Sequence, residues 1–124
     1  DKEPSIYPYY QEFEIGGGKY TRKGFIGRVK LEDFSTKKIL PHELTFPKHK
    51  QDRLKLNTAC KANMSPVFSV YSDPEGDVEK AIEKNLGEPI FDVTTADGVR
   101  NILWKISDEG VISRITERLA DTSF

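Results

Sequence analysis

The sequence predicts an α+β fold, with a mixed, mostly antiparallel sheet, hairpins at both ends of the chain and about three helices. Two turn signals, Gly-Gly-Gly at 16–18 and Asp-Gly at 97–98, lie between β-branched and aromatic stretches and predict the hairpins. Apolar residues at helical spacing predict the helices. The expected order is strand, strand, helix, strand, helix, strand, strand, helix, which argues against a doubly wound parallel sheet.

The first hairpin has strong local signals. Residues 5–15, SIYPYYQEFEI, are rich in aromatic and β-branched side chains, and the glycines at 16–18 allow the positive φ angles of a tight reversal. Residues 20–31 are therefore expected to return as the partner strand. Gly24 and Gly27 inside that strand predict a β-bulge, with a close approach to a ligand as the alternative.

The middle of the chain predicts one helix and one strand. Pro47 suits the first turn of a helix, because proline lacks only a donor that the first turn leaves unpaired; the helix is expected to end near Ala59 or Cys60. Cys60 is expected to be a small core residue, not a nucleophile. Residues 66–71, PVFSVY, predict a buried strand.

The second half predicts a helix, a hairpin and a last helix. Ser, Asp and Pro at 72–74 predict a helix start, and Gly87 is expected to end that helix. Residues 89–94 and 99–106 predict the hairpin around the turn at 97–98. The apolar positions expected to face the core from the two helices are Val78, Ala81, Ile82 and Leu86, then Val111, Ile112, Ile115 and Leu119.

Three further side chains of this half have expected structural roles. Trp104 stands among apolar residues and is expected in the core, and Arg100 is expected to secure the turn at Asp97. Ser107 or Asp108 is expected to cap the last helix.

The composition predicts a single domain over residues 1–124, which is 36% hydrophobic and 31% charged. Nineteen basic and twenty acidic residues give a net charge of -1, so no global field favours nucleic acid or an anionic membrane. No apolar run approaches the roughly 20 residues of a membrane helix. We expect a cytoplasmic protein without an internal disulfide, and the missing initial methionine suggests a domain excised from a longer protein.

Ionisable side chains are densest between residues 39 and 71, which contain both histidines. His42 and Glu43 lie in a predicted loop, where Glu43 is a candidate general base; the alternative is a loop glutamate paired with a nearby lysine. No third ligand is spaced to join His42 and His49, so we expect no metal site.

A cationic group stands at the start of the helix predicted from Pro47. Helix N-termini attract anions, so Lys48, Lys50 and Arg53, with Asp52 beside them, are the expected phosphate- or nucleotide-binding residues. The alternative is a solvated charged face in which Asp52 and Arg53 bind their neighbours.

Three segments carry a resemblance that covers nearly the whole chain. Residues 41–55, PHELTFPKHKQDRLK, 63–73, NMSPVFSVYSD, and 97–108, DGVRNILWKISD, resemble the uncharacterised prokaryotic family called domain of unknown function 1015. Residues 5–13 and 21–34 look like the hairpin of that family. The resemblance implies a longer parent protein in which an Asp-Gly-His-His-Arg motif follows the last helix.

That motif is similar to the Gly-x-His-Arg element of the ParB-like superfamily, whose members handle nucleotide phosphates. The resemblance therefore implies a nucleotide-dependent enzyme, such as a small-molecule or amino acid kinase that uses ATP or ADP with magnesium. It would assign activation of a substrate hydroxyl to Glu43, its orientation to His42, and neutralisation of phosphate charge to Lys48 and Arg53. This chain alone would be inactive.

Two other kinds of function stay open. The chain could be a non-catalytic module that binds a nucleotide or an amino acid. It could instead be a structural module that contacts the rest of the parent protein or a second copy of itself. The expected contact is an exposed aromatic edge made of Tyr7, Tyr9, Tyr10 and Phe13.

Overall fold

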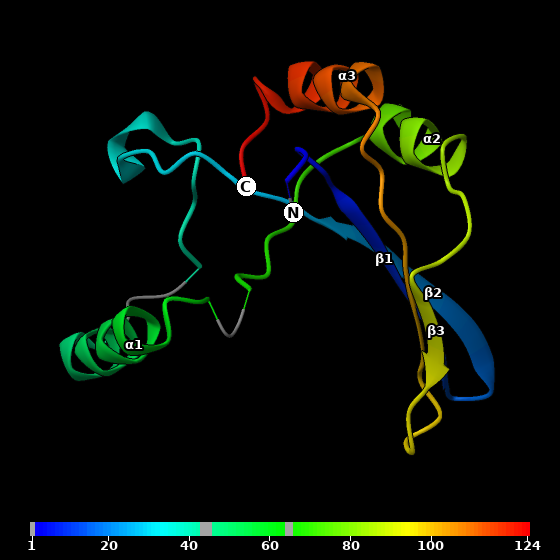
Figure 1. Ribbon diagram of the computed structural model, residues 1–124, viewed down its shortest axis with the longest axis horizontal. Coiled ribbons are helices and arrows are strands. Elements are labelled where there is room, and N and C mark those ends of the chain that lie inside the picture. The colour runs from blue at the N-terminus through cyan, green and yellow to red at the C-terminus, as the bar shows by residue number, and fades with distance from the viewer. Residues whose placement is uncertain (1, 43–45, 64–65) are drawn as a thin grey trace. The chain divides into compact units, whose positions relative to one another are not determined.

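The computed structural model describes residues 2–42, 46–63 and 66–124 (Figure 1). The chain forms two compact units, which we describe separately. The sheet unit comprises Asp1–Lys30 and Asp73–Asp121, and the inserted unit comprises Leu31–Ser72 and Thr122–Phe124. The expectation of a single domain over the whole chain stays a prediction.

The sheet unit contains four antiparallel strands, which confirms the α+β class. These are β1 (Tyr7–Ile15), β2 (Gly18–Ile26), β3 (Phe91–Thr94) and β4 (Arg100–Leu103), in the spatial order β2-β1-β4-β3. Both predicted hairpins are therefore present, and their first and last strands, β1 and β4, pair with each other in the centre of the sheet. Because β1 is a central strand, the prediction that its aromatic residues form an exposed edge is wrong.

The N-terminal hairpin turns at Gly16 and Gly17, whose φ angles of 59° and 83° are those that glycine adopts easily. Its pairing register runs without interruption along both strands, and Gly24 lies directly opposite Tyr9. The predicted bulge at Gly24 is therefore wrong. The second strand also ends at Ile26, short of residue 31, and the residues that follow are exposed.

Two helices belong to the sheet unit, α2 (Asp77–Glu83) and α3 (Glu109–Leu119). The carboxylate of Asp73 accepts hydrogen bonds from the first three N–H groups of α2, at 3.0, 3.1 and 3.3 Å. Asp73 therefore caps the helix as predicted, although the helix itself begins four residues later, at Asp77. Its end at Glu83 precedes the predicted stop at Gly87. Asp108 caps α3 through the N–H of Val111 at 2.9 Å, as predicted.

The core of this unit lies between α2, α3 and one face of the sheet (Figure 1). Tyr10 packs edge-on against Trp104, with ring centroids 5.0 Å apart, and Trp104 is half-buried. Arg118 of α3 binds Asp77 of α2 at 2.8 Å and joins the two helices. The buried apolar side chains are those of Ile6, Pro8, Tyr10, Val78, Ala81, Ile82, Ile102, Ile106 and Ile115.

The inserted unit contains the 3-10 helix η1 (Phe34–Thr36) and the helix α1 (Pro47–Cys60). The bounds of α1 match the prediction, but Cys60 is exposed, so its predicted core role is wrong. Residues 66–71 form no strand and expose their apolar side chains, which corrects the prediction of a buried strand there. None of the described residues of this unit is buried.

Candidate functional site

The first turn of α1 is open to an anion. Pro47 occupies the first helical position, and Phe46 before it offers no side-chain cap to the free N–H groups. No acidic residue stands in this turn. Lys48, His49 and Lys50 follow, all exposed, so two lysines flank the positive end of the helix dipole.

The helix divides the predicted phosphate-binding residues between two sides. Successive residues are rotated by about 100° around a helix, so Lys48 and Lys50 point in nearly opposite directions. Lys48 and Asp52 share one side, with Lys55, whereas Lys50 and Arg53 lie on the other. The first side bears a depression of about 360 Å³ lined by Lys48, His49, Gln51, Asp52 and Lys55. One helix supplies all of these residues, so the depression is shallow and encloses nothing.

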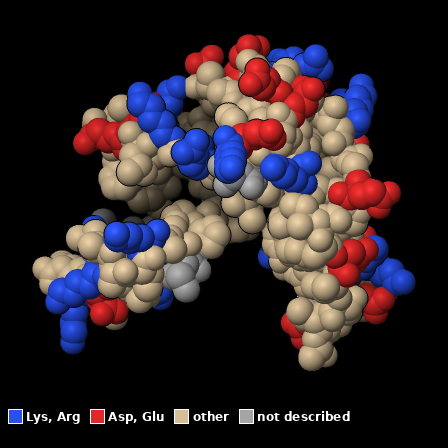
Figure 2. All heavy atoms as spheres, in the orientation of Figure 1, with Lys and Arg blue, Asp and Glu red and all other residues tan. Residues whose placement is uncertain are grey.

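Electrostatically this helix is unbalanced. Among the residues that the structure describes, the side chains of Lys48, Lys50, Asp52 and Arg53 form no ion pair within 4.0 Å. Lysine and arginine side chains stand out on the visible surface of α1, among uncharged residues and some acidic ones (Figure 2). The neighbour-bonded arrangement considered for Asp52 and Arg53 is thus not formed in the described part of the chain.

The predicted catalytic pair is described only in part. His42 is exposed in the segment that leads to α1, and Glu43 lies outside the described residues. His49 packs edge-on against Phe46, with ring centroids 6.2 Å apart. Over residues 2–42, 46–63 and 66–124, no three His, Cys, Asp or Glu side chains come close enough to hold a metal ion.

The sequence model of the family described as "Protein of unknown function (DUF1015)" matches residues 1–124. The chain belongs to this family. Comparisons with curated proteins and with solved structures found no match. In the described part of this DUF1015 chain, no helix is long and apolar enough to cross a bilayer.

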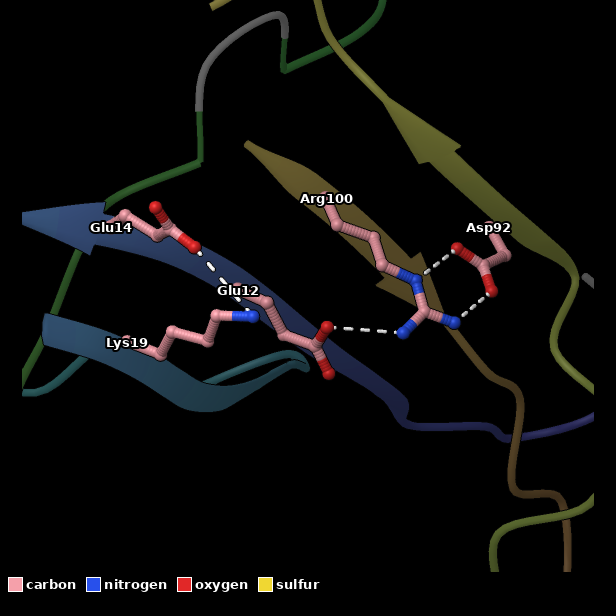
Figure 3. Close-up of polar contacts among 5 residues, drawn as sticks. All are labelled: Glu12, Glu14, Lys19, Asp92 and Arg100. Carbon is pink, nitrogen blue, oxygen red and sulfur yellow. Dashed lines mark hydrogen bonds and ion pairs between the residues drawn. The ribbon is translucent and has the colours of Figure 1, made fainter. Parts of the chain in front are cut away.

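The DUF1015 chain has a second charged group, which sequence reasoning missed. Arg100 on β4 donates to both carboxylate oxygens of Asp92 on β3 and to Glu12 on β1, at 3.0 Å (Figure 3). These hydrogen bonds lower the pKa of Asp92 below its ordinary value. Arg100 does not secure Asp97, which instead accepts from Thr95 and from the N–H of Val99. The one arginine holds both carboxylates through these hydrogen bonds, so this group is structural.

A third charged group joins the sheet to a helix. Lys23 on β2 binds Glu79 and Glu83 of α2 at 2.5 and 2.6 Å, and its ammonium group lies 5.8 Å from the centre of the Tyr10 ring. The hydrogen bonds to Glu79 and then Glu83 raise the pKa of Lys23 above its ordinary value. A lysine held in this way stays charged at neutral pH and is unsuited to be a nucleophile or a base.

The opposite face of the sheet holds a polar network around Asn101, which is the buried polar residue among those that the structure describes. Its Oδ1 accepts from the Tyr9 hydroxyl at 2.6 Å and from Gln11 Nε2 at 3.1 Å, and its Nδ2 donates to the Val99 carbonyl at 3.0 Å. Since both ends of the amide are satisfied, this network orders the sheet and leaves no group for a ligand. Of the three charged groups, the one on α1 is therefore the group whose cations Lys48, Lys50 and Arg53 form no ion pair within the described part of the chain.

Proposed function

We propose that residues 41–55 form the phosphate-binding part of a nucleotide-handling enzyme, of the kind represented by ParB-like small-molecule kinases. The observation that supports this proposal is the first turn of α1, which has no side-chain cap and no acidic residue. A phosphate there would accept hydrogen bonds from the free N–H groups and would interact favourably with the helix dipole.

The opposed directions of Lys48 and Lys50 suit a ligand at the end of the helix better than a ligand at its side. Helical side chains lean toward the N-terminus, so two long lysine stems on opposite sides can converge over the first turn. Arg53 stands on the same side as Lys50 and is close enough in the helix to contact a second phosphate group. ATP, ADP or pyrophosphate would match this spacing better than a single phosphate ion.

The chemistry proposed for the site rests on which residues precede the first turn of α1 in the sequence. Glu43 would take the proton from a substrate hydroxyl, and His42 would orient that hydroxyl, because both precede the phosphate-binding turn by only a few residues. Magnesium would neutralise phosphate charge when bound. Within residues 41–42 and 46–55, the described part of this segment, Asp52 is the one carboxylate that could serve it.

The proposal is tested by thermal unfolding of the chain alone and with ATP, ADP or pyrophosphate, each with and without magnesium. At about 100 times Kd, a ligand that binds only the folded state adds roughly 2.7 kcal/mol of stability. The gain should vanish in Lys48→Ala and Arg53→Ala and persist in Lys84→Ala, which removes an exposed lysine of the sheet unit. No gain with any ligand, or an equal loss in the control variant, contradicts a phosphate site at α1.

Binding and catalysis are then separated by assaying product formation in a longer DUF1015 protein. The variant Glu43→Gln should bind nucleotide as well as the unmodified protein does but should lose turnover. Nucleotide binding without any product formation would mean that the protein senses the nucleotide and is not an enzyme that acts on it.

A second candidate function, an interaction module, is favoured by a different observation. The described residues of the inserted unit bury no apolar side chain, and Leu31 and Val67 are 89% and 87% exposed. Where exposed apolar side chains form a contiguous patch, they mark a surface that meets a partner. Sedimentation that depends on protein concentration but not on nucleotide would favour this function, and a monomer at all concentrations would argue against self-association.

A further inference from the structure

The last residues of the chain bind the beginning of the inserted unit through their backbone. The N–H of Phe124 donates to the carbonyl of Lys38 at 2.8 Å, and the N–H of Leu40 donates to the carbonyl of Phe124 at 2.7 Å. The two bonds flank Ile39, which is the bonding pattern of two parallel extended segments. Phe124 therefore lies beside residues 38–40 in the manner of a single parallel bridge, although neither segment forms a regular strand.

Two side chains reinforce this pairing. The hydroxyl of Ser123 donates to the carbonyl of Lys37 at 2.9 Å. Lys37 has a φ angle of 59°, a conformation that is costly for a residue with a side chain and needs its surroundings to hold it. The Phe124 ring lies 6.3 Å from the ring of Tyr71, next to the last residue of the segment 31–72. One tripeptide thus contacts both ends of the inserted segment.

These contacts matter because the burial of apolar side chains contributes little to the stability of the inserted unit. None of its described residues is buried, so a hydrophobic core cannot supply its order. The segment 31–72 is covalently tied to the sheet unit only where it leaves at Lys30 and returns at Asp73. Residues 122–124, which continue from α3, supply a third connection by non-covalent bonds.

We propose that residues 122–124 are a releasable strap, which holds together the two ends of the segment 31–72 that carries α1. Release of the strap frees residues 37–40 and Tyr71 while the sheet unit stays folded, because the contacts of Ser123 and Phe124 described above are all made with residues of the inserted unit. The strap thereby controls how ordered the ends of the α1-bearing segment are. This inference does not depend on the proposed phosphate site.

The test is amide hydrogen exchange, measured by NMR on the complete 124-residue chain. The amides of Leu40 and Phe124 should exchange several times more slowly than in an unstructured peptide. In Phe124→Ala and Ser123→Ala, exchange at Leu40 should become about fivefold faster, as expected for the loss of one contact of this kind. The amides of Tyr10 and Ile102 in the sheet should be unaffected.

The matched control is Ser113→Ala, which removes an exposed hydroxyl from α3, the helix that precedes the strap. It should leave exchange at Leu40 unchanged, whereas Tyr71→Ala should accelerate it from the other end of the inserted segment. Unprotected exchange at Leu40 in the unmodified chain overturns the proposal. So does a Phe124→Ala variant in which the sheet amides lose protection together with Leu40, because the strap would then not be separable from the sheet unit.

Discussion

Arg100 and Asp92 form a two-pronged pair across neighbouring strands, in which the guanidinium Nε and one terminal nitrogen each reach a different oxygen of the carboxylate. The remaining terminal nitrogen binds Glu12 on the strand at the other side, so one arginine ties three strands together (Figure 3). Arginine suits this position because its planar guanidinium group can donate to both oxygens of Asp92 on one side and to one oxygen of Glu12 on the other.

Replacing this arginine should therefore lower the melting temperature. Arg100→Ala leaves two carboxylates close together without a cation, and Arg100→Lys keeps the charge but loses the fork, so the first variant should melt lower than the second. Arg114→Ala removes an exposed arginine of α3 and serves as the control. Circular dichroism melts at low and high salt are the measurement, and the effect should shrink in salt. Equal melting temperatures for Arg100→Ala and the control would refute this role.

The same pair predicts a dependence of stability on pH. Hydrogen bonds from Arg100 lower the pKa of Asp92 in the folded state below its value in the unfolded chain. The resulting stabilisation is fully present above the unfolded pKa of about 3.9 and is lost as the pH falls through the folded pKa. We expect the free energy of unfolding, measured in urea between pH 6 and pH 2, to fall less with acid in Asp92→Asn than in the unmodified chain. Parallel curves for the two proteins would contradict the coupling.

Among the polar residues of the sheet, Asn101 is the one whose substitution should reduce stability most. Asn101→Ala leaves the Tyr9 hydroxyl and Gln11 without their acceptor in a part-buried environment, and we expect a loss of about 1–3 kcal/mol in the free energy of unfolding. Tyr9→Phe removes only one donor and should cost about 1 kcal/mol. Denaturant titrations of both variants measure the difference, and a smaller loss for Asn101→Ala than for Tyr9→Phe would argue against the network.

Two apolar substitutions should separate the sheet unit from the inserted unit. Ile102 is buried and Leu54 on α1 is 68% exposed. Ile102→Ala should cost about 2–5 kcal/mol through lost burial and the cavity left behind, whereas Leu54→Ala should change stability by no more than about 0.5 kcal/mol. Chemical denaturation of the two variants makes the comparison. A large effect of Leu54→Ala would mean that a partner or a second copy covers α1.

Asp73 should stabilise α2 from outside the helix. Its carboxylate accepts from the N–H groups of Asp77, Val78 and Glu79, so Asp73→Ala should cost about 1 kcal/mol, as the loss of a helix cap does. Asp73→Asn keeps an acceptor oxygen and should cost less. The measurement is again denaturant unfolding, with hydrogen exchange at Val78 as a local readout. Unchanged exchange at Val78 in Asp73→Ala would refute the capping role.

Much of the candidate site could be read from the chain alone. Pro47 marks the start of α1, and the exposed Lys48, Lys50 and Arg53 follow at the predicted positions, because a helix start depends on residues within one turn. The division of these residues between two sides of α1 also follows from helix geometry. Whether Glu43 approaches them lies outside the described residues.

The features that depend on neighbours in the chain can be read from the sequence. The N-terminal turn at Gly16 and Gly17, the cap at Asp108 and the length of α1 are all set by local backbone chemistry, which a stretch of a few residues specifies.

The features that need a partner far along the chain become visible in the folded structure alone. The segment 66–71 has strand-forming residues but forms no strand, and β1 becomes a central strand because β4 pairs with it. Arg100 binds Asp92 and Glu12 instead of the nearby Asp97. Strand propensity measures how well a side chain packs on a pleated sheet that is already paired. The sequence of one strand does not specify which other segment will pair with it.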